Sequence, residues 1–411
     1  MKINKSKFVP LNLMGNIDVD VLLRVGYIAV ICLCGIILRV KMFPHTSRDM
    51  EVFLEPWYNH FLNNGGFKAV GDEIGDYTPL YYYYLAALTY FKSVSAQTGI
   101  KILSVAFDYI MALYVMMIVK LNEKKDSVVP FIAFAAAFML PTVIMNSAVW
   151  GQCDVIYTCF LVMCLYYLLE GNDKTAMIMF GVSFSLKLQA IFFVPLIGIL
   201  IFKKKIRPLN LLWIPAVYVV SIIPAVIAGG NFWRLLTVYF RQSGQYNAFC
   251  MSLPNLWGLW KDVDYDILGS AGVYFAGAAV VTVMYYYITK KELKITRNSL
   301  VALAMISSFI VPFVLPFMHE RYFYTSEIMF VIFAFYFRDR LWLIFTSQFC
   351  SVQCLSSYLF GKEYMDIRLL TLIEIFNIVM VYLSLKKEIS NPTGSEIELI
   401  EKPVKKAADQ S

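Results

Sequence analysis

The stretch VLLRVGYIAVICLCGIILRVKMF, residues 21–43, decides the fold class, because it is an apolar run long enough to cross a bilayer. Apolar runs of roughly 17–25 residues recur towards the C-terminal end. The chain has 411 residues, 59% of them hydrophobic and 16% charged, whereas a soluble domain carries about a quarter charged residues. The sequence therefore predicts an all-α, polytopic membrane protein. A β-barrel would show short alternating segments instead.

The positive charge of the chain is distributed over short loops between the apolar runs. The positive-inside rule places such basic loops in the cytoplasm. The net charge is +7, but no basic face with interleaved aromatic residues lies outside the apolar runs, so nucleic acid is excluded as a partner. The eight cysteines show no CxxC spacing of a metal site. The first apolar run lacks a signal-peptide cleavage site, and we keep it as the first span.

The order of the charged loops predicts about twelve crossings. In the first external loop, about residues 44–99, an amphipathic helix from Met50 to about Phe61 lies in the membrane interface. Residues 63–66 (Asn-Asn-Gly-Gly) break it. A second helix over Leu80–Phe91 stays at the headgroup level, which suits its four consecutive tyrosines. If residues 78–92 crossed instead, Lys187 would be buried in one long span and residues 122–126 would move outside.

The remaining loops follow from this count. Residues 176–200 are interpreted as two short helices that meet at the outer face near Lys187. A long external loop covers about residues 229–265, and both termini are cytoplasmic. Residues 1–389 form a single membrane domain. Residues 390–411 are polar without apolar periodicity and are predicted to be a disordered cytoplasmic tail.

On this topology the uncommon polar side chains gather on the outer face, and ionisable groups at membrane depth mark a site by default. Any one of them alone is explained as a rim residue or a structural ion pair, which is the interpretation we favour for Arg234. Their convergence from six separate segments is not explained in that way. They are Arg48, Asp49, Glu51, Asp76, Gln152, Asp154, Lys187, Gln189, Arg234, Arg241, His319, Glu320 and Arg321.

Asp49 directly follows the first span and has two compatible interpretations. It suits the N-cap of the helix that starts near Met50, and a lone carboxylate suits proton abstraction from an attacking hydroxyl. Lys187, amid apolar neighbours, either snorkels outward or meets an anion. His319 and Arg321 suit a phosphate, or else form an external ion-paired turn.

The segment Trp150–Asp154 begins a helix at the outer face. Gln152 and Asp154 suit sugar hydroxyls, and Asp154 suits equally a structural pairing with Lys187, while Trp150 also fits a membrane belt. No HExxH, GxSxG, P-loop or dinucleotide fingerprint appears. No cofactor is predicted, and a divalent cation is unsupported because the acids form no obvious cage. Without a cytosolic nucleotide-binding domain, a donor that reaches the outer face must be carried by lipid.

In order along the chain, these motifs resemble the GT-C superfamily of integral membrane glycosyltransferases over about residues 21–385. The set is similar to lipid-linked oligosaccharide glucosyltransferases and to bacterial polyprenol-phosphate mannosyltransferases. The segments that carry the resemblance are Asp49, Asp76-Tyr77-Thr78-Pro79-Leu80, Trp150–Asp154, Ser185-Leu186-Lys187-Leu188-Gln189, Leu253-Pro254-Asn255-Leu256-Trp257 and His319-Glu320-Arg321-Tyr322.

The resemblance implies inverting transfer of a hexose from a polyprenyl-phosphate sugar to a lipid-linked glycan, glycolipid or cell-wall polymer at the outer face. It makes Asp49 the general base, and whether Glu51 assists stays open. The residues expected at the donor phosphate are Lys187, His319, Arg321 and Arg241. Those expected to contact sugar or acceptor are Glu51, Asp76, Tyr77, Gln152, Asp154, Gln189, Glu320 and Tyr322.

Two other classes of protein compete with an enzyme. A transporter or lipid-linked-sugar flippase predicts polar groups around the bilayer midplane and an internal repeat, neither of which the sequence shows. A non-catalytic subunit of a wall-polymer assembly complex also fits the composition. The enzyme hypothesis requires Asp49, Lys187 and Arg321 to share one outer-face cavity, and wide separation would exclude it.

Overall fold

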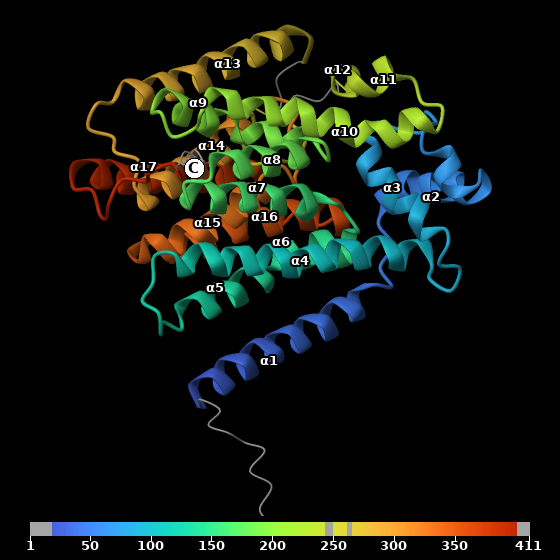
Figure 1. Cartoon of the computed structure of the whole chain (residues 1–411), viewed down its shortest axis with the longest axis horizontal. Helices are drawn as coiled ribbons and strands as arrows, with labels where there is room; N and C mark the ends of the chain where they lie inside the picture. Colours follow the sequence, from blue (N-terminus) through green and yellow to red (C-terminus); the bar gives the residue numbers. More distant parts are fainter. Residues whose placement is uncertain (1–18, 243–249, 261–264, 401–411) are drawn as a thin grey trace, which may run out of the picture.

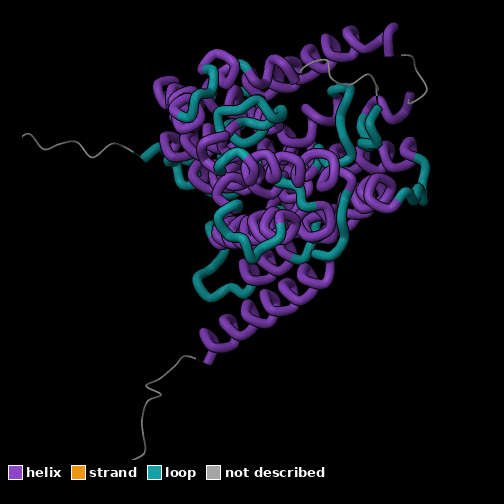
Figure 2. Tube along the Cα trace, turned by 90° about the vertical axis from the view of Figure 1, so that its right-hand side faces the viewer, coloured by secondary structure: helices purple, strands orange, loops and turns teal. Residues whose placement is uncertain are grey.

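The structure is a computed structural model that describes residues 19–242, 250–260 and 265–400. The regular elements of this part are helices, accompanied by isolated β-bridges alone, which confirms the all-helical prediction (Figure 2). The longer helices are α1 (Val19–Met42), α4 (Ala96–Lys120), α7 (Asp154–Leu169), α8 (Asp173–Phe184), α10 (Trp213–Ile227), α13 (Tyr265–Thr289), α14 (Arg297–Val314), α15 (Tyr324–Tyr336), α16 (Trp342–Phe360) and α17 (Ile367–Ser390).

Shorter helices connect them. These are η1 (Met50–Leu54), α2 (Glu55–Asn63), η2 (Gly66–Ala69), α3 (Pro79–Leu88), α5 (Val129–Phe138), α6 (Pro141–Ile144), η3 (Met145–Trp150), η4 (Leu188–Phe193), α9 (Val194–Phe202), η5 (Pro208–Leu212), α11 (Phe232–Leu236), α12 (Val238–Gln242), η6 (Leu256–Trp260) and η7 (Arg338–Arg340).

In the described part, six helices are long and apolar enough to cross a membrane. They are Leu22–Met42, Ala96–Lys120, Pro208–Ile227, Gly269–Thr289, Arg297–Val314 and Ile367–Ser390. The pair Val129–Phe138 and Pro141–Trp150, bent by 45°, counts as a seventh if it forms one span. These spans indicate a membrane protein. The expected twelve crossings are not confirmed, because apolar helices such as α7 and α15 are shorter than a full span.

The helices lie side by side, and burial increases from the edges to the centre (Figure 1). Over their apolar windows, α1 is 11% buried and α13 is 17% buried, while α14 is 83% buried. In Figure 1 α1 and α13 form opposite edges, and α14 and α15 lie between them. An apolar helix face that the protein leaves uncovered is suited to lipid. The polar side chains described below are therefore held by the central helices.

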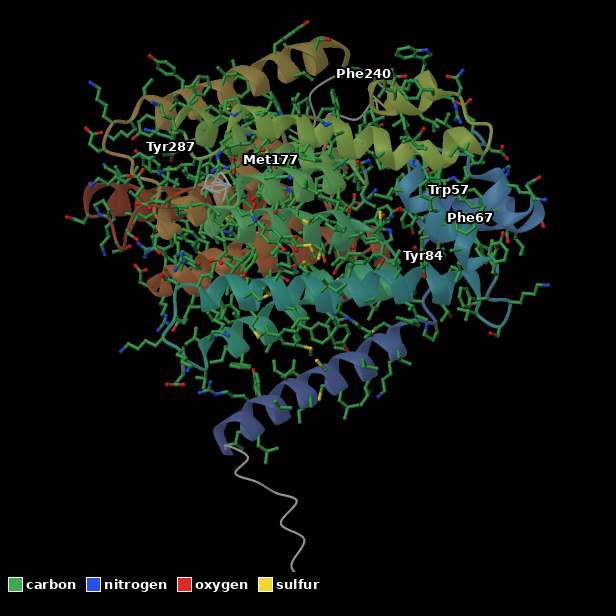
Figure 3. All side chains as sticks on the ribbon, viewed as in Figure 1. Trp57, Phe67, Tyr84, Met177, Phe240 and Tyr287 are labelled. Carbon is green, nitrogen blue, oxygen red and sulfur yellow. The ribbon has the colours of Figure 1, made fainter. Side chains whose placement is uncertain are left out.

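The first loop folds as a helical lobe at one end of the bundle (Figures 1 and 3). η1 and α2 occupy the stretch predicted to be an amphipathic helix, and α2 ends at Asn63 before Gly65, whose φ is +84°. α3 has ten residues, about 15 Å of helix, half of the hydrocarbon thickness of about 30 Å. This length supports the interpretation that it does not cross.

The tyrosines of α3 take part in packing and not only in a headgroup layer. Tyr82 is 4% exposed and its ring lies 5.5 Å from that of Trp57 on α2. The hydroxyls of Tyr83 and Tyr84 donate to backbone carbonyls of α10 and α4. These contacts between helices account for the position of the tyrosines better than a location at the headgroup level does.

Two groups of loops lie at opposite ends of the bundle, and each group is held together by contacts among its members. At one end, contacts join residues 24 and 126, 123 and 338, 121 and 297, 203 and 290, and 205 and 396. At the other end, contacts join residues 71 and 234, 78 and 185, and 255 and 315. The predicted inner and outer loops separate in the same way. Which end faces the cytoplasm stays a prediction.

Residues 391–400, which we expected to belong to a disordered tail, lie against the first of these ends. Ile397 is 8% exposed and its N–H donates to the carbonyl of Ile295 at 2.8 Å. The N–H of Ile400 donates to Gly171 at 3.0 Å, and Lys205 pairs with Glu396 at 2.9 Å. Disorder from residue 390 onward therefore does not hold for these ten residues. Residues 401–411 lie outside the described part.

Candidate active site

Two interruptions of helical structure bring polar side chains into the packed interior. Gly151, with φ +80°, ends η3, and α7 begins three residues later at Asp154. A left-handed conformation favours glycine, so this turn presents Trp150, Gln152 and Asp154 on a short stretch. The second interruption is at Lys187, whose extended backbone (φ −153°, ψ 139°) separates α8 from η4. The predicted break at Lys187 is confirmed.

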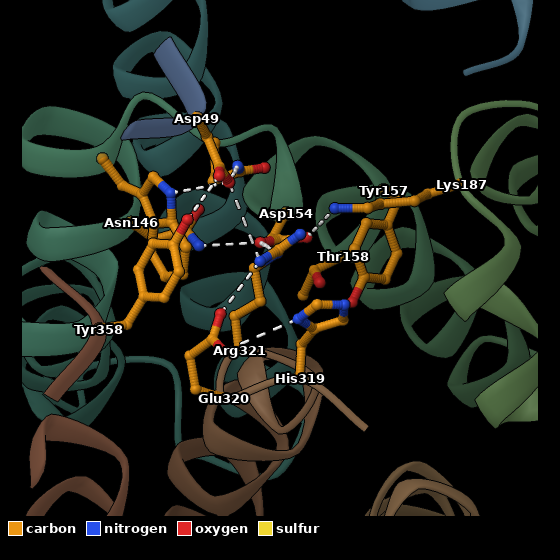
Figure 4. Close-up of polar contacts among 12 residues, drawn as sticks. Asp49, Asn146, Asp154, Tyr157, Thr158, Lys187, His319, Glu320, Arg321 and Tyr358 are labelled. Atoms are coloured by element: carbon orange, nitrogen blue, oxygen red, sulfur yellow. Dashed lines mark hydrogen bonds and ion pairs between the residues drawn. The ribbon is translucent and has the colours of Figure 1, made fainter. Parts of the chain in front are cut away.

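Asp49 is 9% exposed and its carboxylate accepts three hydrogen bonds (Figure 4). Oδ2 accepts from Trp150 Nε1 at 3.0 Å and from Gln152 Nε2 at 2.5 Å. Oδ1 accepts from the hydroxyl of Tyr358 on α16 at 2.5 Å. Asp49 makes no N-cap hydrogen bond to η1, so the capping interpretation is wrong. Its direction is fixed by residues about 100 and 300 positions away in sequence.

Asp154 and Lys187 form a buried ion pair. Asp154 is 1% exposed, and its Oδ1 contacts the Lys187 ammonium. Asn146 Nδ2 donates to the other carboxylate oxygen at 2.9 Å. The ammonium also lies 5.7 Å from the ring of Tyr77 and 5.9 Å from that of Tyr157. The structural pairing of Asp154 with Lys187 is therefore present, and Lys187 does not snorkel outward.

Arg321 connects Asp49 with Asp154. Its guanidinium lies 3.0 Å from Glu320, 3.6 Å from Asp154 and 4.0 Å from Asp49, measured between the nearest nitrogen and oxygen atoms. It also lies 5.0 Å from the centre of the Trp150 ring. Asp49, Lys187 and Arg321 are therefore not widely separated, because Arg321 approaches Asp49 and also contacts Asp154, the partner of Lys187. The outer-face cavity that they were expected to share stays a prediction.

The segment that carries Arg321 is an irregular turn between α14 and α15. Glu320 is 4% exposed, and its second oxygen lies 3.8 Å from His319 Nδ1. His319 forms bridges with Met251 and Ser252 of the long loop, and its ring packs against that of Tyr322 at 5.2 Å. Four of the expected residues thus form one wall of the site.

Tyr77 and Gln189 border the Lys187 side of this cluster. The Tyr77 ring lies 5.0 Å from Trp57, and burial raises the pKa of its phenol well above the ordinary value, so the hydroxyl stays protonated. Gln189 follows Lys187 in η4, and its buried Oε1 has no hydrogen-bond partner. A buried amide oxygen without a partner loses its hydration, so Gln189 is suited to accept from a bound hydroxyl.

Some predicted residues lie apart from the cluster. Arg241 is 47% exposed and pairs with Glu73 at 3.0 Å; Arg234 pairs with the same carboxylate at 3.5 Å. Both contacts lie on the exposed surface of the protein, since the Glu73 side chain is 63% exposed. Glu51 and Asp76 are exposed. The assignment of Arg241 to a donor phosphate stays a prediction, and the pairing of Arg234 with Glu73 fits its interpretation as a rim residue.

Three residues at the centre of the cluster were not among the expected site residues. Tyr358 and Asn146 lie within apolar stretches, where a tyrosine or an asparagine carries no motif. Trp150 was interpreted as a possible belt residue, but it is fully buried and donates to Asp49. In the part of the chain that the structure describes, no group of three or more His, Cys, Asp or Glu is placed to hold a metal ion.

The buried cluster combines a carboxylate that three donors orient with the cations Arg321 and Lys187, and comparison with known families gives the class of protein. The sequence pattern of glycosyltransferase family 87 matches residues 76–312, more than half of the chain. The chain therefore belongs to glycosyltransferase family 87, one of the GT-C type of membrane glycosyltransferases. The matched range includes Asp154 and Lys187, whereas Asp49 and Arg321 lie outside it. No curated protein matches the chain.

Proposed function

We propose that the protein transfers a hexose, with inversion, from a polyprenyl-phosphate sugar to a lipid-linked glycan, a glycolipid or a cell-wall polymer at the outer face of the cell membrane. The observation that carries the proposal is the position of Asp49. A carboxylate that three donors orient lies 4.0 Å from Arg321, and Arg321 in turn contacts Asp154, the partner of Lys187.

The proposed reaction uses the two sides of this cluster for the two substrates. Asp49 accepts the proton of the acceptor hydroxyl while the hydroxyl oxygen attacks the anomeric carbon of the donor. The bond between that carbon and the phosphate oxygen breaks, and polyprenyl phosphate leaves. Inversion requires the acceptor and the phosphate on opposite faces of the sugar ring. Tyr358, beside Asp49, and Lys187 lie on opposite sides of Arg321 in Figure 4.

The leaving phosphate needs positive charge. Arg321 and Lys187 are the cations of the cluster, with His319 beside them, and each contacts a carboxylate. A guanidinium forms bidentate hydrogen bonds with phosphate, and stabilisation of developing charge is often the largest contribution to catalysis. We expect the phosphate to take over part of the contacts that Asp154 and Glu320 now make.

The test is transfer of radiolabelled sugar from synthetic polyprenyl-phosphate mannose and glucose by the purified full-length protein. Asp49→Asn is expected to lower kcat by about 10³-fold, because general-base catalysis contributes about 10²–10⁴-fold. Glu55→Gln, which changes an exposed carboxylate on α2, is the matched control and should keep near-wild-type turnover. Equal turnover of Asp49→Asn and wild type would reject Asp49 as the base.

A further inference from the structure

A cavity of about 400 Å³ lies next to the residues that hold Asp49. Its walls come from the C-terminal half of α16, the loop before α17, and residues 250 and 252 of the long loop. The volume is that of a small-molecule pocket. The polar side chains on its walls are Ser252, Gln353, Ser357, Glu363, Tyr364 and Asp366.

Two structural links connect this cavity to the candidate active site. The first is α16, which lines the cavity with Cys354 and Ser357 and places Tyr358, one turn after Cys354, against Asp49 at 2.5 Å. The second is Ser252, which lines the cavity and forms a β-bridge with His319. The first link places the cavity beside Tyr358, and the second places it beside the backbone of His319.

One polar atom in the cavity wall has no partner. Gln353 Oε1 is buried and makes no hydrogen bond, although a buried amide oxygen normally has one. Rotation of this amide towards the cavity would allow a bound hydroxyl to donate to it. The neighbouring hydroxyl and carboxylate groups of Ser357 and Glu363 add donor and acceptor capacity of the kind that a sugar ring requires.

We propose that this cavity binds the sugar of the acceptor, a hydroxyl-rich glycan head group, and presents one of its hydroxyls to Asp49 past Tyr358. The inference rests on the proposed function, and it assigns the acceptor, the second substrate, to this cavity. The donor phosphate lies on the Lys187 side, so the two substrates approach Asp49 from opposite directions.

The acceptor probes are octyl α-mannoside and octyl β-glucoside, offered to the full-length protein in lipid nanodiscs with polyprenyl-phosphate mannose or glucose. Ser357→Leu narrows the cavity and Gln353→Leu removes the unpartnered oxygen. Each should raise the acceptor KM at least tenfold and leave the donor KM within twofold. Ser356→Leu, the same change one position away and outside the cavity lining, is the matched control and should resemble wild type.

A second measurement needs no substitution. Cys250 lines the cavity and is partly exposed, so its alkylation by iodoacetamide, followed by mass spectrometry of the peptide, reports on occupancy. The acceptor probe that supports transfer should slow alkylation of Cys250 at least threefold, while the donor alone should not.

The outcomes separate the two hypotheses. One outcome would overturn the acceptor pocket alone. In it the wild type transfers sugar, Ser357→Leu and Gln353→Leu keep the wild-type acceptor KM, and the acceptor does not protect Cys250 from alkylation. An increase in the donor KM in place of the acceptor KM would overturn it as well. Absence of transfer by wild type from every donor and acceptor pair would overturn the proposed function, and the pocket assignment with it.

Discussion

At the scale of single residues, the orientation of Asp49 depends on three hydrogen bonds from two distant parts of the chain. Trp150 and Gln152 precede α7, and Tyr358, in the last turn of α16, is 309 residues after Asp49. The Tyr358 ring stacks on Trp150 with centroids 4.6 Å apart, and 38% of the residue is exposed. It is thus a positioning residue with one face open to the outside of the protein.

Tyr358→Phe tests this role. The change keeps the stacked ring and removes the hydroxyl, and a hydrogen bond to a charged group contributes about 1.5–3 kcal/mol. We expect kcat for sugar transfer to fall about 10- to 100-fold, with the melting temperature changed by less than a few degrees. Tyr285→Phe, on the exposed face of α13, should have no effect. If both variants keep wild-type kcat, Tyr358 does not position the base.

The buried pair of Asp154 and Lys187 is expected to be strongly coupled. Removal of one partner leaves an uncompensated buried charge, which costs about 3–5 kcal/mol, reduced here because Arg321 lies 3.6 Å from Asp154. Lys187→Met and Asp154→Asn each lower the free energy of unfolding, and the sum of the two losses should exceed the loss in the double variant. A double-mutant cycle on the free energy of unfolding measures a coupling of about 1–3 kcal/mol.

The matched control for that cycle is the outer pair of Glu73 and Arg241. Their side chains are 63% and 47% exposed, and an exposed ion pair contributes about 0–1 kcal/mol. Glu73→Gln and Arg241→Met should therefore be nearly additive. A cycle for Asp154 and Lys187 that is equally additive would contradict the buried interaction.

At the scale of elements, the turn at Gly151 determines which residues face Asp49. A Cβ at this position would lie 2.7 Å from the Met50 side chain, in a backbone with φ +80°. The left-handed conformation costs a non-glycine residue about 1–2 kcal/mol. Gly151→Ala should lower the free energy of unfolding by at least that amount and reduce transfer by displacing Trp150 and Gln152.

Gly277→Ala is the control for this substitution. Gly277 lies in α13, and no atom is within 4 Å of an added Cβ, so alanine should stabilise the helix slightly. Thermal unfolding and transfer activity of the two variants check the prediction. Wild-type stability and activity in Gly151→Ala would show that the turn does not need glycine.

The breaks in helices were predictable from the sequence, and the partners across helices were not. Lys187 and Gln152 both interrupt the hydrophobic pattern, so they could be assigned to the site before the fold was known. Tyr358 and Asn146 do not interrupt the hydrophobic pattern, because a single tyrosine or asparagine within a helix is typical of a packing residue. Their contacts depend on how α16 lies against Asp49 and how η3 lies against Asp154.

At the scale of the whole molecule, the loops separate into two ends, as the charge pattern predicted. The pattern carries this information because every basic loop must stay on one side of the membrane. The number of spans was less predictable, since α7 and α15 are apolar but shorter than a full crossing. A short helix that is buried among its neighbours is as apolar as a membrane span. Its composition therefore does not show that it is too short to cross.

The orientation of the two ends decides whether the candidate site faces outward. Lys362 and Lys291 are exposed and lie in loops that we assign to the outer and inner ends respectively. In a Cys250→Ser background, Lys362→Cys should react with a membrane-impermeant maleimide in intact cells. Lys291→Cys should react only after permeabilisation, because the positive-inside rule places basic loops in the cytoplasm. The reverse labelling pattern would place Asp49 on the cytoplasmic side, where a polyprenyl-phosphate donor would have to present its sugar inward, and would refute the outer-face reaction.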